Sequence, residues 1–186
     1  MANPTNHDWD RLKKVCRYLK GRPRMIQKKV DMDMDVVEVF ADSDWAGCKT
    51  TRRSTSGGAA FVYGMCVKTW STMQSGIARS SGEAELYAVN KGMAEGLGLQ
   101  SLARDLVEVW TDSSACQGTC QRTGLGRMKH LEVENLWSQS VVRAGRVKLG
   151  KINGKYNVAD LMTKYLGRAD IDFLLRLMGV VEPISV

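Results

Sequence analysis

The strongest constraint on the fold is a near repeat. The heptads VEVFADS (residues 37–43) and VEVWTDS (residues 107–113) share five of seven residues. Along each heptad the residues alternate between two faces, which is typical of a β-strand. Each strand delivers an aspartate, Asp42 or Asp112, at its carboxyl end. If the two strands pair in parallel, the carboxylates lie roughly 5 Å apart, one strand spacing. Because two close carboxylates repel each other unless a cation lies between them, the pattern predicts a metal site there.

Composition and length fit one folded domain. The chain has 186 residues, of which 44% are hydrophobic, enough for a core. No apolar run approaches the roughly 18 residues of a membrane span, and the start MANPTNHDWD lacks the features of a signal peptide. The five cysteines have no Cys-x-x-Cys or Cys/His spacing, which favours reduced thiols over a zinc site. We therefore expect a soluble intracellular protein.

The net charge of +7 is unevenly distributed along the chain. Residues 11–29 hold nine basic and no acidic residues, whereas the rest of the chain has 18 basic and 20 acidic ones. This pattern favours a basic arm with local patches over a general polyanion-binding surface. The alternative, that the basic run is simply a solvated helix face, remains open.

Hydrophobic periodicity and breaker residues predict an α/β fold. Two further strands follow the first heptad after short turns, which gives a three-stranded antiparallel meander. A capping-box signature, SSGE at residues 80–83, opens a long helix with an apolar stripe. The expected elements are a helix at 7–20, strands at 36–43, 59–63 and 66–72, a helix from 80, a strand at 107–111, helices near 115 and at 129–143, a strand at 146–152, and helices at 157–165 and 168–178.

Other acidic residues are candidates for the same site. Glu83 and Glu85 flank the apolar stripe of the long helix at similar angles, so periodicity does not choose between them. Glu83 already serves as the capping-box acid, which favours Glu85 as the functional residue. Asp160 lies at an expected helix start, where the helix dipole favours an acid and Lys164 offers an ion-pair partner one turn later. For each aspartate taken alone, a structural role at a turn or helix end is the alternative.

Six motifs occur in one order along the chain: FADSDWAG, TRRSTSGG, SSGEAELYAV, WTDSSA, MKHLEVENLW and NVADLMTKYL. Together they resemble the ribonuclease H domain of copia-type retrotransposon Pol polyproteins. The segment HDWDRLKKVCRYLKG resembles the connection from reverse transcriptase to ribonuclease H in these polyproteins. The resemblance implies a ribonuclease H-like mixed five-stranded sheet, with its first three strands antiparallel and strands 1, 4 and 5 parallel. We expect a basic arm at 1–35, the domain at 36–167, and a C-terminal helix and tail at 168–186.

The resemblance also implies a reaction and the residues that carry it. Catalytic and metal-binding roles fall on four acids: Asp42, Glu85, Asp112 and Asp160. They would hold two Mg²⁺ ions, or Mn²⁺, for hydrolysis of the RNA strand of an RNA–DNA hybrid during reverse transcription. Asp42 would bridge both ions, Asp112 and Asp160 would hold the ion near the attacking water, and Glu85 would serve the leaving-group side. Asp44, two residues after Asp42, is expected to be structural.

The same resemblance suggests partners and a location. The hybrid is the expected nucleic-acid partner, and the reverse transcriptase portion of the same polyprotein is a second candidate. We expect the protein to act in the cytoplasm, within a retroelement particle, or in the nucleus. The candidate substrate contacts are Arg52, Arg53, Ser54, Ser56, Ser80, Ser81, Lys129 and His130.

Two departures from the family pattern leave a second function open. Family members usually have a longer connection between the long helix and the strand that leads to Asp112, so the short connection here could shift that strand's register. No histidine matches the one that cellular relatives carry near Asp160. The alternative function is therefore a catalytically inactive remnant of a retroelement that binds nucleic acid or another partner.

Overall fold

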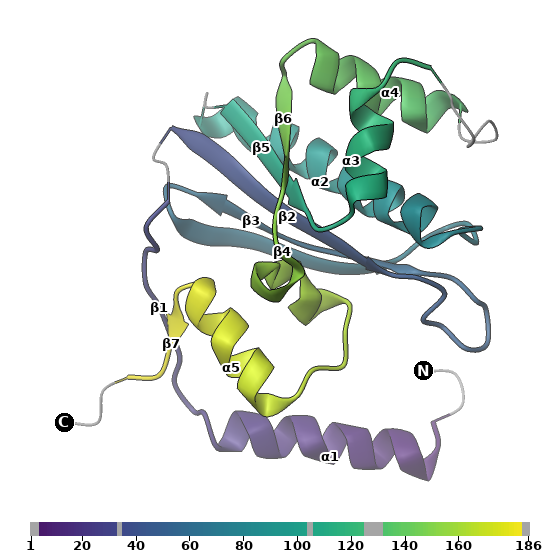
Figure 1. The fold of residues 1–186 in the computed structure, drawn as a ribbon. Coiled ribbons are helices and arrows are strands. Elements are labelled where there is room, and N and C mark those ends of the chain that lie inside the picture. Colours follow the sequence, from purple (N-terminus) through teal and green to yellow (C-terminus); the bar gives the residue numbers. More distant parts are fainter. Residues whose placement is uncertain (1–3, 33–34, 104–105, 125–131, 184–186) are drawn as a thin grey trace.

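The computed structural model describes residues 4–32, 35–103, 106–124 and 132–183. Its centre is a five-stranded sheet in the order β4-β3-β2-β5-β6 (Figure 1). The first three strands of this sheet in chain order, β2, β3 and β4, pair antiparallel, and β5 and β6 run parallel to β2. The predicted α/β class, meander and parallel strands are confirmed. The strands are β2 (Val36–Asp44), β3 (Thr55–Val62), β4 (Met65–Met73), β5 (Leu106–Thr111) and β6 (Val147–Lys151).

The two heptads pair with each other in matching register over their first four positions. In the parallel pairing of β2 with β5, Val39 lies opposite Val109, and the neighbouring positions of the heptads match in the same way. The short connection before Leu106 therefore causes no shift of register. Because both strands end at the same edge of the sheet, Asp42 and Asp112 extend from neighbouring positions.

Three helices cover one face of the sheet (Figure 1): α2 (Ser81–Ala103), α3 (Ser114–Gln121) and α4 (Glu132–Arg143). The predicted apolar stripe of α2 supplies Leu86, Val89 and Met93, which are fully buried. They form one core cluster with Val39 and Val109 of the paired strands. Full burial of each such side chain stabilises the fold by about 1.5–3 kcal/mol. This packing fixes the position of α2 across the sheet.

The C-terminal elements cover the opposite face: η2 (Gly154–Tyr156), η3 (Val158–Met162) and α5 (Arg168–Leu177). A second buried cluster forms there around Phe40 and Phe61, whose ring centroids lie 5.5 Å apart in an edge-to-face arrangement. The neighbouring strands β2 and β3 are thus buried on both faces, whereas most residues of the edge strand β4 are exposed.

The predicted helix at 157–165 is wrong in type, because the segment forms only the short 3-10 helix η3. Two features hold it against the sheet. The buried side chain of Asn157 donates to the carbonyl of Ala41 at 3.1 Å and accepts from the backbone N of Ala159 at 3.2 Å. Gly57 on β3 provides the room, since a Cβ there would lie 2.5 Å from Cγ2 of Thr163. These contacts to the sheet take precedence over a regular α-helical path.

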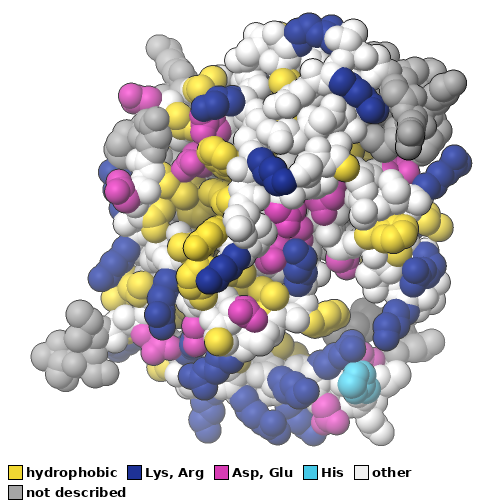
Figure 2. Space-filling view, in the orientation of Figure 1, with side chains coloured by type: hydrophobic (Ala, Val, Ile, Leu, Met, Phe, Trp, Pro, Cys, Tyr) yellow, Lys and Arg dark blue, Asp and Glu magenta, His cyan; other side chains and the backbone are white. Residues whose placement is uncertain are grey.

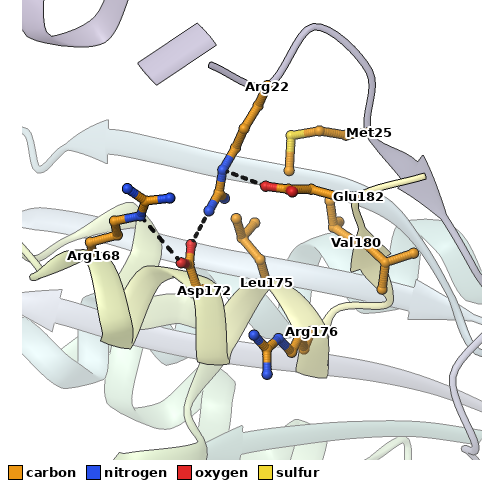
Figure 3. Close-up of a pocket in the computed structure, with 9 residues that line it drawn as sticks. Arg22, Met25, Arg168, Asp172, Leu175, Arg176, Val180 and Glu182 are labelled. Carbon is orange, nitrogen blue, oxygen red and sulfur yellow. Dashed lines mark hydrogen bonds and ion pairs between the residues drawn. The ribbon is translucent and has the colours of Figure 1, made fainter. Parts of the chain in front are cut away.

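The N-terminal arm folds back onto the C-terminal tail. The predicted first helix is confirmed as α1 (Asn6–Lys20), and none of its residues is buried. Strand β1 (Ile26–Gln27) pairs antiparallel with β7 (Val180–Val181). Arg22 joins the two parts, because its guanidinium lies 2.5 Å from Asp172 and 2.9 Å from Glu182, at the edge of a pocket (Figure 3). The boundaries predicted at residues 35 and 167 stay predictions.

Two global features complete the fold. All five cysteines are free, as predicted. In the ranges that the structure describes, we find no helix with the length and apolar character needed to cross a membrane.

Candidate metal centre

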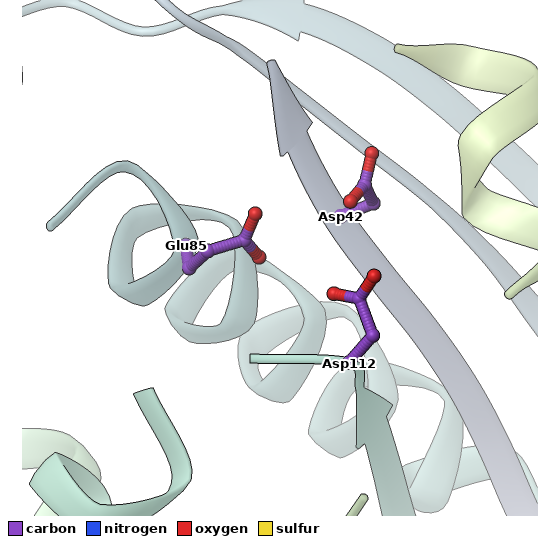
Figure 4. A group of neighbouring side chains, drawn as sticks. All are labelled: Asp42, Glu85 and Asp112. Atoms are coloured by element: carbon purple, nitrogen blue, oxygen red, sulfur yellow. The ribbon is translucent and has the colours of Figure 1, made fainter. Parts of the chain in front are cut away.

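Three carboxylates converge at the edge of the sheet where β2 and β5 end. Asp42 comes from the end of β2, Asp112 directly follows β5, and Glu85 comes from the start of α2 (Figure 4). One oxygen from each lies within 4.8 Å of the other two. On the face shown in Figure 2, acidic side chains gather near the centre, with lysine and arginine side chains around them. The predicted proximity of the two strand-end aspartates is confirmed.

Asp42 is the most deeply buried of the three, with only 1% of its surface exposed. Its Oδ2 accepts a hydrogen bond from Oγ1 of Thr163, and its Oδ1 lies 3.4 Å from Nζ of Lys164. Burial raises the pKa of Asp42 to about 6, and the nearby charges of Asp160 and Asp112 act in the same direction. The contacts with Thr163 and Lys164 oppose this shift only in part.

Glu85 lies against the end of β2. Its Oε1 accepts hydrogen bonds from the backbone N and Oγ of Ser43, at 3.3 and 2.9 Å. Its Oε2 is buried and has no hydrogen-bond partner. Burial raises the pKa of Glu85 to about 8, and the charge of Asp42 adds to the effect. Glu85 therefore brings an unsatisfied oxygen to the two aspartates.

Glu83 has a different place at the start of α2. Its Oε2 accepts from the backbone N of Arg79 at 2.9 Å, while its own N donates to Oγ of Ser80 at 3.2 Å. This arrangement resembles the predicted capping box, in which the Glu83 carboxylate would accept from the backbone N of Ser80. Here it accepts from the backbone N of the preceding residue, Arg79. The structure thus places Glu85, and not Glu83, in the acidic cluster.

Asp160 lies outside the group of three carboxylates that are within 4.8 Å of one another, although its side chain interacts with that of Asp42. Its Oδ1 lies 2.7 Å from Nζ of Lys164, the predicted partner one turn later. Burial raises the pKa of Asp160, the contacts with Lys164 lower it, and the charge of Asp112 raises it further. The charge of Asp112 therefore still acts on Asp160, but the carboxylate of Asp160 is directed towards Lys164.

The donor set fits a divalent cation. All donors are carboxylate oxygens, the hard ligands that Mg²⁺ and Ca²⁺ prefer. The buried Oε2 of Glu85 has no hydrogen-bond partner among the described residues, and burial raises the pKa of Asp42 and of Glu85, so nearby protein groups do not fully stabilise the ionised forms of these carboxyls. A cation bound among the three side chains would stabilise these ionised forms.

Comparison with known proteins gives several retrotransposon Pol polyproteins among the relatives. No family model matches the sequence. The Retrovirus-related Pol polyprotein from transposon RE2 of Arabidopsis thaliana is 27% identical to this chain. The alignment is 193 residues long with its gaps and covers 98% of this chain. The corresponding polyprotein from transposon TNT 1-94 of Nicotiana tabacum is 26% identical over 97% of the chain. The chain spans only 13% and 14% of the length of these two relatives.

Solved structures identify the fold. LC11-RNase H1, isolated from compost, matches with a TM-score of 0.55 at 17% identity, over 76% of this chain and 99% of that one. The chain has a ribonuclease H-like fold, and its sequence is similar to copia-type retrotransposon Pol polyproteins across nearly its whole length. The foamy viral protease-reverse transcriptase in complex with an RNA/DNA hybrid shares the fold, with a TM-score of 0.51 at 14% identity over 79% of this chain and 22% of that one.

The substrate contacts predicted for this ribonuclease H-like domain lie in different environments. Arg52, Arg53 and Ser81 are exposed, and so is Ser80, whose hydroxyl caps α2. Ser54 and Ser56 are buried instead. The hydroxyl of Ser54 accepts from the backbone N of Ala46, and that of Ser56 accepts from Nε2 of Gln74. These two hydroxyls therefore bind within the protein and are not available to phosphates. The predicted contacts Lys129 and His130 lie outside the described residues.

Several residues that shape the site of the ribonuclease H-like domain were not expected from sequence. Ser43 orients Glu85, Thr163 binds Asp42, and Asn157 ties η3 to β2. The repeated Asp-Ser step was the signal for Ser43, and the position of Asn157 before a predicted helix marked it as a cap. Thr163 gave no such signal. Asp44 is structural as expected, since its carboxylate accepts from the backbone N of Thr55.

Proposed function

We propose that this ribonuclease H-like domain is a metal-dependent endonuclease that hydrolyses the RNA strand of RNA–DNA hybrids during retrotransposon reverse transcription. The observation that carries the proposal is the convergence of Asp42, Glu85 and Asp112 within 4.8 Å at the ends of two parallel strands. Such an edge is where open α/β sheets bind their ligands. Two Mg²⁺ ions, or Mn²⁺, would there activate the attacking water and stabilise the leaving oxygen of the phosphodiester.

Each acidic residue has its own proposed role in the reaction. Asp42 interacts electrostatically with Glu85, Asp112 and Asp160, which suits it to the bridging position. Glu85 is held by Ser43 on one side of Asp42, the side proposed for the leaving group. Asp160 is carried by η3 on the other side, and we propose that it acts with Asp112 where the water attacks.

The proposed substrate follows from the family and from exposed basic residues. The foamy viral relative was solved in complex with an RNA/DNA hybrid. In this chain, the exposed side chains of Arg52 and Arg53 follow β2 in the loop towards β3. They are the proposed phosphate contacts, together with the exposed start of α2 at Ser80 and Ser81. The proposed partner in the polyprotein is its reverse transcriptase portion, in a cytoplasmic particle or in the nucleus.

A cleavage assay tests the proposal. A hybrid whose RNA strand is labelled is incubated with the whole chain and Mg²⁺, and the wild type is compared with Asp42→Asn. We expect cleavage by the wild type and a loss of about 10²-fold or more in the variant, as when a group that stabilises developing charge is removed. A wild-type chain that is folded and still no more active than Asp42→Asn would refute the enzymatic proposal.

The alternative is a catalytically inactive remnant that binds nucleic acid or another partner. The observation in its favour is Lys164, whose ammonium group pairs with Asp42 and Asp160, two of the four proposed metal-binding acids. Binding of a hybrid measured by fluorescence anisotropy separates the two functions. The remnant would bind the hybrid equally well with or without Mg²⁺ and would leave the RNA intact, whereas the enzyme would cleave it only with metal.

A further inference from the structure

We infer that Lys164 is the resident counter-ion of the acidic centre, held between Asp42 and Asp160, and that its ammonium group sets how tightly the centre binds metal. The inference rests on the proposed metal-dependent function and extends it to a residue outside the acidic set. It assigns Lys164 a positioning role, because it acts through the carboxylates and not on the substrate.

The geometry places one ammonium group against two carboxylates. Nζ of Lys164 lies 2.7 Å from Oδ1 of Asp160 and 3.4 Å from Oδ1 of Asp42. The Lys164 side chain is 39% exposed, whereas those of Asp42 and Asp160 are 2% and 15% exposed. The charged group is thus directed inwards from a side chain that still reaches solvent.

The neighbouring residue completes the arrangement. Thr163 donates its hydroxyl to Oδ2 of Asp42, so both oxygens of Asp42 are engaged by consecutive residues after η3. Asp160, on the same short segment, turns its carboxylate to Lys164 and stays outside the close group of three acids. A metal ion that used Asp42 and Asp160 together would therefore have to exchange contacts with Lys164.

The physical consequence is competition between two cations. A positive charge roughly 5 Å from a divalent ion opposes binding by about tenfold or more at the effective dielectric constants of a protein surface. A lysine suits this role, because its compact charge sits on a flexible stem that can swing into solvent. The lysine would balance the acidic cluster while metal is absent and would give way when metal binds.

The test measures metal affinity by calorimetric titration of the whole chain with Mn²⁺, with the metal-induced rise in Tm as a second readout. We expect Lys164→Met to bind Mn²⁺ about tenfold more tightly than the wild type, and Lys164→Arg to stay near the wild type because it keeps the charge. The matched control is Lys68→Met, which removes a lysine of the edge strand β4 whose ammonium lies 2.5 Å from Glu95 of α2.

The outcomes separate this inference from the proposed function. If wild type and Lys164→Met bind Mn²⁺ equally, or the variant binds more weakly, the inference is wrong and the metal centre stands. If neither binds, both the inference and the metal-dependent function fail. Asp112→Asn checks that the titration reports this centre, since it should weaken binding in either background. If Lys164→Met does not fold, Lys164→Gln takes its place in the Mn²⁺ titration, with the same expected and contradicting outcomes.

Discussion

Glu85 and Ser43 are joined by two hydrogen bonds, because Oε1 of the glutamate accepts from both the backbone N and the hydroxyl of the serine, at 3.3 and 2.9 Å. Ser43 directly follows Asp42 on β2. The pair therefore locks the start of α2 to the end of the strand and aims Glu85 at the aspartates. Contacts of this kind commonly orient the ligands of metal sites.

Removal of the Ser43 hydroxyl should loosen this arrangement. We expect Ser43→Ala to weaken Mn²⁺ binding by roughly tenfold, with a loss of only about 0.5–1.5 kcal/mol in the free energy of unfolding. Titration calorimetry and urea unfolding measure the two quantities. Ser101→Ala is the matched control, because its hydroxyl donates to the carbonyl of Gly98 within α2. Equal metal affinity in Ser43→Ala and the wild type would remove Ser43 from the site.

The stability of the metal-free protein should fall as pH rises. Burial raises the pKa of Glu85 from 4.5 to about 8 and that of Asp42 from 3.8 to about 6, so the folded chain holds these protons more tightly than the unfolded chain. The stabilisation is complete below the unfolded values and is lost as pH rises through the folded ones, by up to about 1.4 kcal/mol per pH unit and group.

Unfolding in urea with a chelator, from about pH 5 to 8.5, measures this dependence. Glu85→Gln should flatten the profile above about pH 6, because it removes the carboxyl whose pKa is raised to about 8, whereas the pKa of Asp42 is raised only to about 6. A wild-type chain that gains stability over the same range would contradict the assigned direction. Added Mg²⁺ should restore the stability lost at high pH, since a bound cation balances the ionised carboxylates.

The backbone beside Asp112 leaves no room for a side chain. A Cβ at Gly154 would lie 2.9 Å from Oδ2 of Asp112, so one of the two must move. We expect Gly154→Ala to reduce hybrid cleavage by about tenfold or more through displacement of Asp112, with the fold intact. Gly118→Ala is the control, because nothing lies within 4 Å of the added atom. Comparable cleavage by both variants would show that the position of Asp112 tolerates the change.

Asn157 connects the segment that carries Asp160 to the strand that carries Asp42. Its buried amide donates to Ala41 and accepts from Ala159. We expect Asn157→Ala to cost about 1–3 kcal/mol in the free energy of unfolding, since it leaves a buried carbonyl without its partner. Hybrid cleavage should fall further than this loss explains, because η3 would no longer be held. A variant with lower stability and unchanged cleavage would assign Asn157 to the fold alone.

Much of the site was predictable because it depends on local pattern. The two heptads predicted two strands, and their common spacing to an aspartate predicted that Asp42 and Asp112 would meet if the strands paired in parallel. The capping role of Glu83 favoured its neighbour Glu85, which the structure places in the acidic cluster. Apolar spacing identified Leu86, Val89 and Met93 as the buried stripe of the long helix. Each of these predictions rests on the residue periodicity within one helix or strand, or on a hydrogen bond between residues that are close in sequence.

The rest depended on contacts between distant segments. The helix predicted at 157–165 became a short 3-10 helix because Asn157 and Gly57 bring it against the sheet. The serines at 54 and 56, predicted to meet phosphates, turned out to be buried by the loop and strands around them. Local sequence shows which residues are polar, but only the packed chain shows which of them still face solvent.

The repeated Asp-Ser step shows this division most directly. The sequence by itself determined that both strands end in an aspartate, since strand period and register depend on the residues of each strand. Only the tertiary structure decided what the two serines bind. Ser43 donates to Glu85, which lies 42 positions away in the chain, whereas Ser113 accepts from the backbone N of Cys116 and caps α3. The tertiary structure likewise decided that Lys164 meets Asp42, 122 positions away. A hydrogen bond between distant residues exists only once the fold has brought its donor and acceptor together.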